Sequence, residues 1–152
     1  MLPLLLVGGA LAAEGLTLGV PVEYDVLGQN IGVRPEILWR PLDPEGALNL
    51  RAAVGLLPGP EYLYLPVSGG ARWDIGRAKD WPVRPLVGVG AEAQTFVISD
   101  HAPVFRVGFY LEAGAAWVMG DNTFGLAVAP DLSLFNRPGA GVSARLTWTH
   151  DL

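Results

Sequence analysis

Apolar and polar residues alternate with a period of two along most of the chain, from residue 15 to the C-terminus. Successive side chains of a β-strand point to opposite faces, so this period predicts strands with one apolar and one polar face. The segment 104–118 is typical, because Phe105, Val107 and Phe109 alternate there with Arg106 and Gly108. The pattern therefore predicts an all-β protein.

Clusters of Gly, Pro, Asn and Asp interrupt the alternation about every 15 residues, which is the spacing of turns in an all-β chain. We expect eight strands, at 15–26, 31–40, 47–57, 61–75, 83–97, 104–118, 123–134 and 141–152. Five prolines fall within these segments: Pro21, Pro35, Pro66, Pro85 and Pro130. Proline cannot donate a ladder hydrogen bond, so bulges or shorter strands are expected at these positions.

The charged residues well inside the predicted strands all fall on the polar face, together with many Gly, Ala and Ser residues. The cations are nine arginines and the single lysine Lys79. Arginine suits buried pairing with carboxylates, and small residues suit the narrow interior of an eight-stranded barrel. We therefore expect the polar face inside and the apolar face outside. The expected lumen charge network consists of Glu23, Arg34, Glu36, Arg51, Arg72, Asp74, Glu92, Arg106, Glu112, Asp131 and Arg145.

Four tryptophans lie on the apolar face, each near the end of an even-numbered strand. In an up-and-down barrel those ends share one rim, and tryptophan is enriched where such a rim meets the membrane surface. A tyrosine lies near the opposite rim. The expected membrane-interface aromatics are Tyr24, Trp39, Trp73, Trp117 and Trp148.

The composition supports a membrane barrel. Charged residues make up 16% of the 152 residues, against roughly 25% in soluble domains, while hydrophobic residues reach 51%. The net charge of −5 argues against nucleic-acid binding, and the absence of cysteine excludes disulfides. The expected fold is an eight-stranded antiparallel up-and-down transmembrane β-barrel with an apolar outside and a polar, charged lumen. No cofactor or metal is expected, because no phosphate loop or metal-ligand spacing appears.

Residues 1–13 form a short apolar stretch followed by small residues, with Ala10 and Ala12 at a small-x-small spacing. This pattern predicts a signal peptide that is cleaved near Ala12 or Ala13. The basic residues that usually begin such a peptide are missing, so either the start is truncated or misplaced, or the stretch is a simple apolar first strand. Residues 14–152 are then expected to form a single barrel domain.

The pattern over residues 15–152 resembles the small eight-stranded outer-membrane barrels of the OmpA and OmpX types. The resemblance implies a bacterial outer-membrane protein whose termini face the periplasm, with Arg and carboxylates replacing an apolar core. It implies membrane lipid and the barrel-assembly machinery as partners and no required oligomer. The family's last strand usually ends on an aromatic residue, where this chain has Leu152.

Three functional hypotheses follow. The first is a non-catalytic outer-membrane barrel with a structural or surface-interaction role. The second is a soluble calycin-like barrel that holds an apolar ligand inside. The third is a lipid-modifying membrane enzyme, although the adjacent Thr149 and His150 point to opposite faces and do not form the His and Ser pair of such enzymes. The sequence Ser99-Asp100-His101 has the residue types of a hydrolase triad, but a solvated turn is the simpler interpretation.

Overall fold

The computed structural model describes residues 15–42, 46–79, 81–134 and 138–151. The signal peptide expected at residues 1–13 lies outside these ranges. The strands are β1 (Leu16–Gly19), β2 (Val22–Asp25), β3 (Asn30–Val33), β4 (Glu36–Trp39), β5 (Leu48–Val54), β6 (Leu57–Pro58), β7 (Tyr62–Asp74), β8 (Val83–Ile98), β9 (Val104–Met119), β10 (Asn122–Ser133) and β11 (Gly139–Asp151), with a short 3-10 helix η1 (Arg77–Lys79). Among the described residues, no helix is long and apolar enough to cross a membrane.

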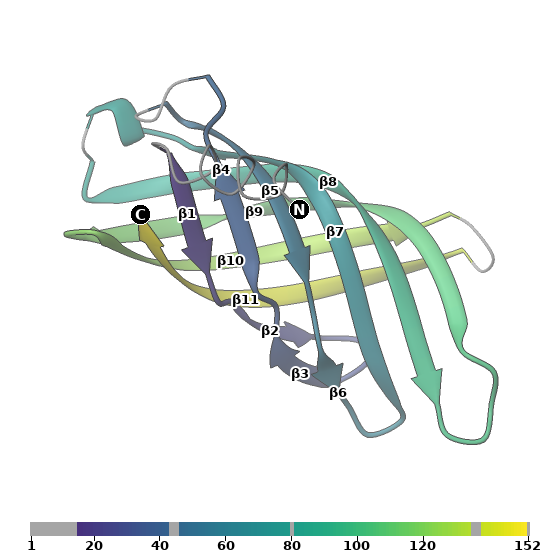
Figure 1. The fold of residues 1–152 in the computed structure, drawn as a ribbon. Helices are drawn as coiled ribbons and strands as arrows, with labels where there is room; N and C mark the ends of the chain where they lie inside the picture. The colour runs from purple at the N-terminus through teal and green to yellow at the C-terminus, as the bar shows by residue number, and fades with distance from the viewer. Residues whose placement is uncertain (1–14, 43–45, 80, 135–137, 152) are drawn as a thin grey trace, which may run out of the picture.

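The strands form one antiparallel sheet that closes on itself (Figure 1). β1 pairs with β4 and β2 with β3, β4 pairs with β5, and β5 and β6 both pair with β7. From β7 to β11 each strand pairs with the next, and β11 pairs with both β1 and β2, which closes the ring. The pairs β1 and β2, β3 and β4, and β5 and β6 each continue one line of the barrel, because the partner register is the same on both sides of each break. The expected eight-stranded up-and-down barrel is therefore confirmed, with strand ends within two residues of the predicted ones.

The prolines within the strands disturb the sheet less than expected. Strand assignment breaks at Pro21 and Pro35, so shorter strand segments are confirmed there. Pro66, Pro85 and Pro130 lie inside β7, β8 and β10. The expected bulges are wrong, because the register is continuous past all five positions and no residue is inserted. Pro21 still accepts a bond through its carbonyl from the Arg34 amide at 2.9 Å, and the Pro35, Pro66 and Pro85 carbonyls also accept main-chain bonds, so only one bond of a rung is lost.

The two faces of the barrel have opposite chemistry, and the apolar face is outside. Phe105 is 57% exposed and Leu111 60%, whereas Arg34 and Glu23 are fully buried. The soluble hypothesis required the apolar face inside, so the structure contradicts it. The interior also takes a few apolar side chains, among them Leu38 and Leu57.

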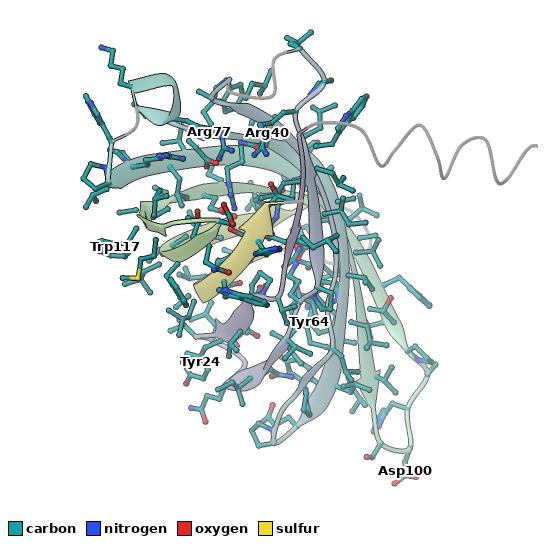
Figure 2. The ribbon with its side chains drawn as sticks, turned by 60° about the vertical axis from the view of Figure 1, so that its left-hand side comes forward. Tyr24, Arg40, Tyr64, Arg77, Asp100 and Trp117 are labelled. Carbon is teal, nitrogen blue, oxygen red and sulfur yellow. The ribbon has the colours of Figure 1, made fainter. Side chains whose placement is uncertain are left out.

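The barrel has two distinct ends. The start of β1 and the end of β11 lie at one end, here called the termini end, next to η1 (Figure 1). The opposite end, here called the far end, carries the turns between β2 and β3, β7 and β6, β8 and β9, and β10 and β11. Figure 2 shows Arg40 and Arg77 at the termini end and Asp100 at the tip of the β8–β9 hairpin at the far end.

Candidate functional site: the charged interior of the barrel

Four arginines and five carboxylates form one continuous series of ion pairs across the middle of the lumen. Acidic and basic residues alternate along it, in the order Glu92, Arg34, Glu23, Arg145, Glu112, Arg51, Glu36, Arg72 and Asp74. We call this set the central ion-pair chain. All nine side chains are buried.

The distances between charged groups within the central ion-pair chain are short. Arg34 Nη1 lies 3.0 Å from Glu23 Oε2, and Arg145 Nε lies 3.1 Å from the same oxygen. Arg145 Nη1 and Arg51 Nη1 both donate to Glu112 Oε2, at 2.6 and 2.8 Å. Each shared carboxylate therefore bridges two arginines.

The remaining ion pairs extend the central ion-pair chain to residues of β7. Arg51 Nε donates to Glu36 Oε2 at 2.5 Å, and Arg72 Nη1 lies 3.5 Å from Glu36 Oε1. Arg72 Nε donates to Asp74 Oδ1 at 3.0 Å. The partners come from β2, β4, β5, β7, β8, β9, β11 and the segment between β3 and β4, so the chain ties opposite walls of the barrel together.

Neutral side chains complete the polar interior. The Tyr64 hydroxyl donates to Glu92 Oε1, and Asn49 Nδ2 donates to Asp74 Oδ2 at 3.2 Å. The Tyr110 ring lies beneath the guanidinium groups of Arg51 and Arg145, at 5.8 and 5.4 Å from its centroid. The alternation placed these residues on the polar face, but charge alone did not single them out. The period-two register was the signal that could have found them.

Little space remains in the middle of the barrel or at its termini end. Arg40, Arg77 and Arg84 line a cavity of about 10 Å³ at the termini end. A second cavity there, beside Thr147, also has a volume of about 10 Å³. Such volumes hold about one water molecule, so this part of the lumen is filled by side chains.

The far end is different, because it contains a cavity of about 180 Å³. We call this space the far-end cavity. Its polar lining includes Asp25, Tyr62, Gln94, Arg106 and Asp131. A second space of about 130 Å³ adjoins it and shares Tyr62, Phe96 and Arg106.

Two residues expected in the charge network are placed in this cavity instead. Within the described residues, Asp131 connects to the central ion-pair chain only through Gln94, whose Nε2 donates to Asp131 Oδ1 at 3.0 Å and to Glu92 Oε1 at 3.1 Å. Arg106 does not join the central ion-pair chain, so the expectation that it belongs to the lumen charge network is corrected. Its guanidinium lies over the Phe96 ring, 4.9 Å from the centroid, because β9 places Arg106 opposite Gln94 toward the far end and not opposite a central carboxylate.

The expected interface aromatics all project outward from the barrel. Trp39, Trp73, Trp117 and Trp148 are each about 40% exposed and lie in the parts of β4, β7, β9 and β11 near the termini end. Tyr24 lies in β2, toward the far end; Figure 2 marks it and Trp117. Trp81, between η1 and β8, is exposed at the termini end as well. Sequence reasoning missed it because it lies in a turn rather than a strand.

The residues considered for catalysis do not form a catalytic arrangement. His101 Nδ1 lies 2.9 Å from the main-chain oxygen of Ser99 and not against the Asp100 carboxylate, as a triad requires. Thr149 is buried and its hydroxyl donates to the Thr123 carbonyl, while His150 Nδ1 lies 3.3 Å from Asn122 Oδ1. Among the described residues, no three metal-ligating side chains gather in one place.

Comparison with known proteins bears on the fold. No family model matches the sequence, and no curated protein is similar to it in sequence. The N-terminal β-barrel domain of Pseudomonas aeruginosa OprF has a similar structure, with a TM-score of 0.67 and 12% identity over 90% of this chain and 98% of that one. Neisserial surface protein A gives a TM-score of 0.56 at 14% identity, over 88% and 91% of the two chains.

The outer membrane enzyme PagL is also similar, with a TM-score of 0.57 and 12% identity over 90% of this chain and 99% of that one. Identities this low relate the chains by fold alone, so the enzyme's activity is not transferred. The ring of strands, the outward apolar face and these likenesses together give the chain the fold of the small eight-stranded outer-membrane β-barrels.

Proposed function

We propose that this chain is an integral protein of the bacterial outer membrane with a structural or surface-interaction role and no catalytic activity. The observation that carries the proposal is the reversed distribution of polarity. Trp117 and Phe105 are exposed, while Arg34 and Glu23 are fully buried. A closed barrel satisfies its backbone hydrogen bonds internally, so it can cross lipid with such an apolar surface. In water the same surface would favour aggregation.

The aromatic residues support a specific position in the bilayer. The tryptophans near the termini end and Tyr24 toward the far end mark the two levels at which the barrel meets the lipid headgroups, since Trp and Tyr favour that interface. Outer-membrane lipid is then the immediate partner, and we expect insertion by the barrel-assembly machinery without a required oligomer.

The central ion-pair chain supports a closed lumen. Its nine buried side chains occupy the middle of the barrel, and the cavities toward the termini end have volumes of only about 10 Å³. We therefore expect no stable ion conductance from single barrels in a planar bilayer. Regular conductance steps from the wild-type chain would contradict a closed lumen.

The membrane assignment is tested by an arginine placed on the outer face. Leu111 in the middle of β9 and Met119 at its end are similarly exposed, at 60% and 64%. If lipid surrounds the barrel, Leu111→Arg lowers the free energy of unfolding by about 2–4 kcal/mol and Met119→Arg by only about 0–1 kcal/mol. The measurement is urea unfolding in lipid vesicles, followed by the mobility of unheated samples on gels.

The two variants separate the membrane proposal from a water-soluble barrel. Around a soluble barrel both positions are equally wet, so both arginines would be equally harmless. Equal stability of the two variants, together with a folded monomer in detergent-free buffer, would therefore overturn the proposal.

A further inference from the structure

We propose that the far-end cavity binds a small zwitterion, whose ammonium group lies between Asp25 and Asp131 and whose anionic group contacts Arg106. This site goes beyond the proposed membrane role. The cavity of about 180 Å³ gathers two carboxylates and one guanidinium at the far end of the barrel.

The charges in this cavity lack the partners that the central charges have. Asp25 Oδ2 accepts a bond from the Tyr62 hydroxyl at 3.4 Å, and Asp131 Oδ1 accepts one from Gln94 at 3.0 Å. Both donors are neutral. Within the described residues, no ion pair involves Asp25, Asp131 or Arg106. Each carboxylate can accept several further hydrogen bonds, so a cation between them has open acceptor sites.

Arg106 offers the complementary anion contact. Its Nε is buried and has no hydrogen-bond partner, and its guanidinium is held against the Phe96 ring. Phe96 in turn stacks on Tyr64, with centroids 5.0 Å apart, and contacts Tyr62 edge-on at 5.3 Å. This aromatic wall fixes the guanidinium and provides an apolar side for the carbon atoms that join the two ends of a zwitterion.

Two glycines hold the carboxylates close to the backbone. A Cβ on Gly141 would lie 2.2 Å from Asp131 Oδ2, and a Cβ on Gly28 would lie 2.3 Å from Asp25 Oδ2. Any larger residue at either position would force the carboxylate to move, and at Gly28 also the Tyr62 hydroxyl, which would lie 1.9 Å from the Cβ. The glycines therefore make room for both carboxylates at the border of the cavity.

An organic cation fits this lining better than a metal ion. Among the described residues that border the cavity, Asp25 and Asp131 are the only acidic ones, and no cluster of three metal-ligating residues occurs in the described part of the chain. An ammonium group needs three acceptors in a roomy site, which two aspartates and a nearby hydroxyl supply. The zwitterion can be a free solute or the headgroup of a phosphatidylethanolamine lipid, since both carry the same two charges.

The test uses the full chain folded in a non-ionic maltoside detergent. Calorimetric titration compares O-phosphoethanolamine, ethanolamine and inorganic phosphate as probes. We expect O-phosphoethanolamine to bind most tightly, ethanolamine more weakly, and phosphate least. Absence of binding by O-phosphoethanolamine and ethanolamine overturns the proposal, and so does phosphate that binds as tightly as O-phosphoethanolamine. Because the experiment needs only a folded barrel in detergent, its failure would leave the membrane proposal intact.

Two variants assign the ends of the ligand. Asp131→Asn should weaken the binding of both amine probes about tenfold, because one charged contact is lost. Arg106→Gln should weaken O-phosphoethanolamine by a similar factor and leave ethanolamine unchanged. Asp100→Asn, which removes the same charge from an exposed far-end loop, is the matched control and should change neither. Heat-modifiable migration on gels checks that each variant is folded, and equal effects of Asp131→Asn and Asp100→Asn would overturn the site.

Nanodiscs distinguish the two sources of the zwitterion. If the lipid headgroup occupies the cavity, discs of phosphatidylethanolamine suppress the binding of free O-phosphoethanolamine relative to discs of phosphatidylglycerol. If a free solute is the ligand, the two kinds of disc give the same affinity. Both outcomes support the site, and they differ only in where its ligand comes from.

Discussion

In the middle of the barrel, four arginines and five carboxylates pair with one another, whereas Asp25, Asp131 and Arg106 at the far end share a cavity without forming an ion pair among the described residues. The same residue types on the same face of the same strands thus have different surroundings. Deep in the lumen a charge without a partner costs several kcal/mol, so each one is paired. Arg106 and Asp131 are only partly buried, and solvation there lowers that cost.

The two regions also differ in packing, because the middle of the barrel is filled more tightly than the far end. The Tyr110 ring lies against Gly70 and Gly90, and its hydroxyl is buried without a hydrogen-bond partner. At the far end Gly28 and Gly141 also lie close to side chains, but both line a cavity of about 180 Å³, whereas the cavities toward the termini end have volumes of about 10 Å³. The middle of the barrel is therefore filled and rigid, while the far end keeps room for solvent or a ligand.

The largest effect is expected from breaking the central ion-pair chain. Arg34→Leu leaves Glu92 buried without a cation among the described ion pairs, while Glu23 keeps Arg145. Removing one partner of a buried pair costs about 3–5 kcal/mol, so the free energy of unfolding should fall by that amount. Urea unfolding in vesicles measures it. A loss below about 1 kcal/mol would show that the central chain does not stabilise the barrel.

A smaller effect is expected from filling space in the middle of the lumen. A Cβ on Gly90 would lie 2.4 Å from the Gly69 carbonyl oxygen and 2.6 Å from the Tyr110 ring. Because a backbone oxygen cannot move away without strain, Gly90→Ala should destabilise by about 1–3 kcal/mol. Gly125→Ala is the control, since its Cβ would meet only ordinary contacts at 3.6 Å or more. Equal stability of the two variants would argue against a tightly filled middle.

A second substitution, at Glu92, tests why Arg34→Leu destabilises the barrel. Adding Glu92→Gln to Arg34→Leu removes the buried charge but keeps a hydrogen-bond acceptor for Tyr64. The double variant should regain about 1–2 kcal/mol relative to Arg34→Leu alone. If the two losses simply add, packing of the Arg34 side chain, and not its charge, explains the first result.

The smallest effect is expected at the far end. Arg106→Leu removes a guanidinium that forms no ion pair within the described residues and is partly exposed, so the free energy of unfolding should change by less than about 1 kcal/mol. It is the matched partner of Arg34→Leu in the same assay. A loss as large as that of Arg34→Leu would remove the distinction between the two regions.

Most of the fold could be predicted from the sequence because its signals are local. The two-residue period gave each strand its inner and outer face, and turn clusters gave the strand ends within two residues. The prolines were less informative. Pro130 lies within β10 with no residue inserted, because the neighbouring pairs on either side keep the register and absorb one missing hydrogen bond.

The interior could be predicted only in part. The sequence indicated which residues point inward, but not that Asp131 and Arg106 lie in a cavity outside the central ion-pair chain. Trp81 was missed because a turn has no periodic pattern to orient a side chain. Both errors concern the ends of the barrel, where the position of a residue depends on the tilt of the strands and on the loops.

Eight strands, their two faces and the kinds of charge in the lumen could all be derived from the amino-acid pattern alone. Which arginine pairs with which carboxylate follows from the folded barrel, because these partners are distant in the sequence, as Arg145 and Glu23 are by 122 residues. Alternation acts between neighbours, whereas pairing across the lumen depends on register, strand tilt and closure of β1 onto β11. The division into a filled middle and an open far end follows from that closure.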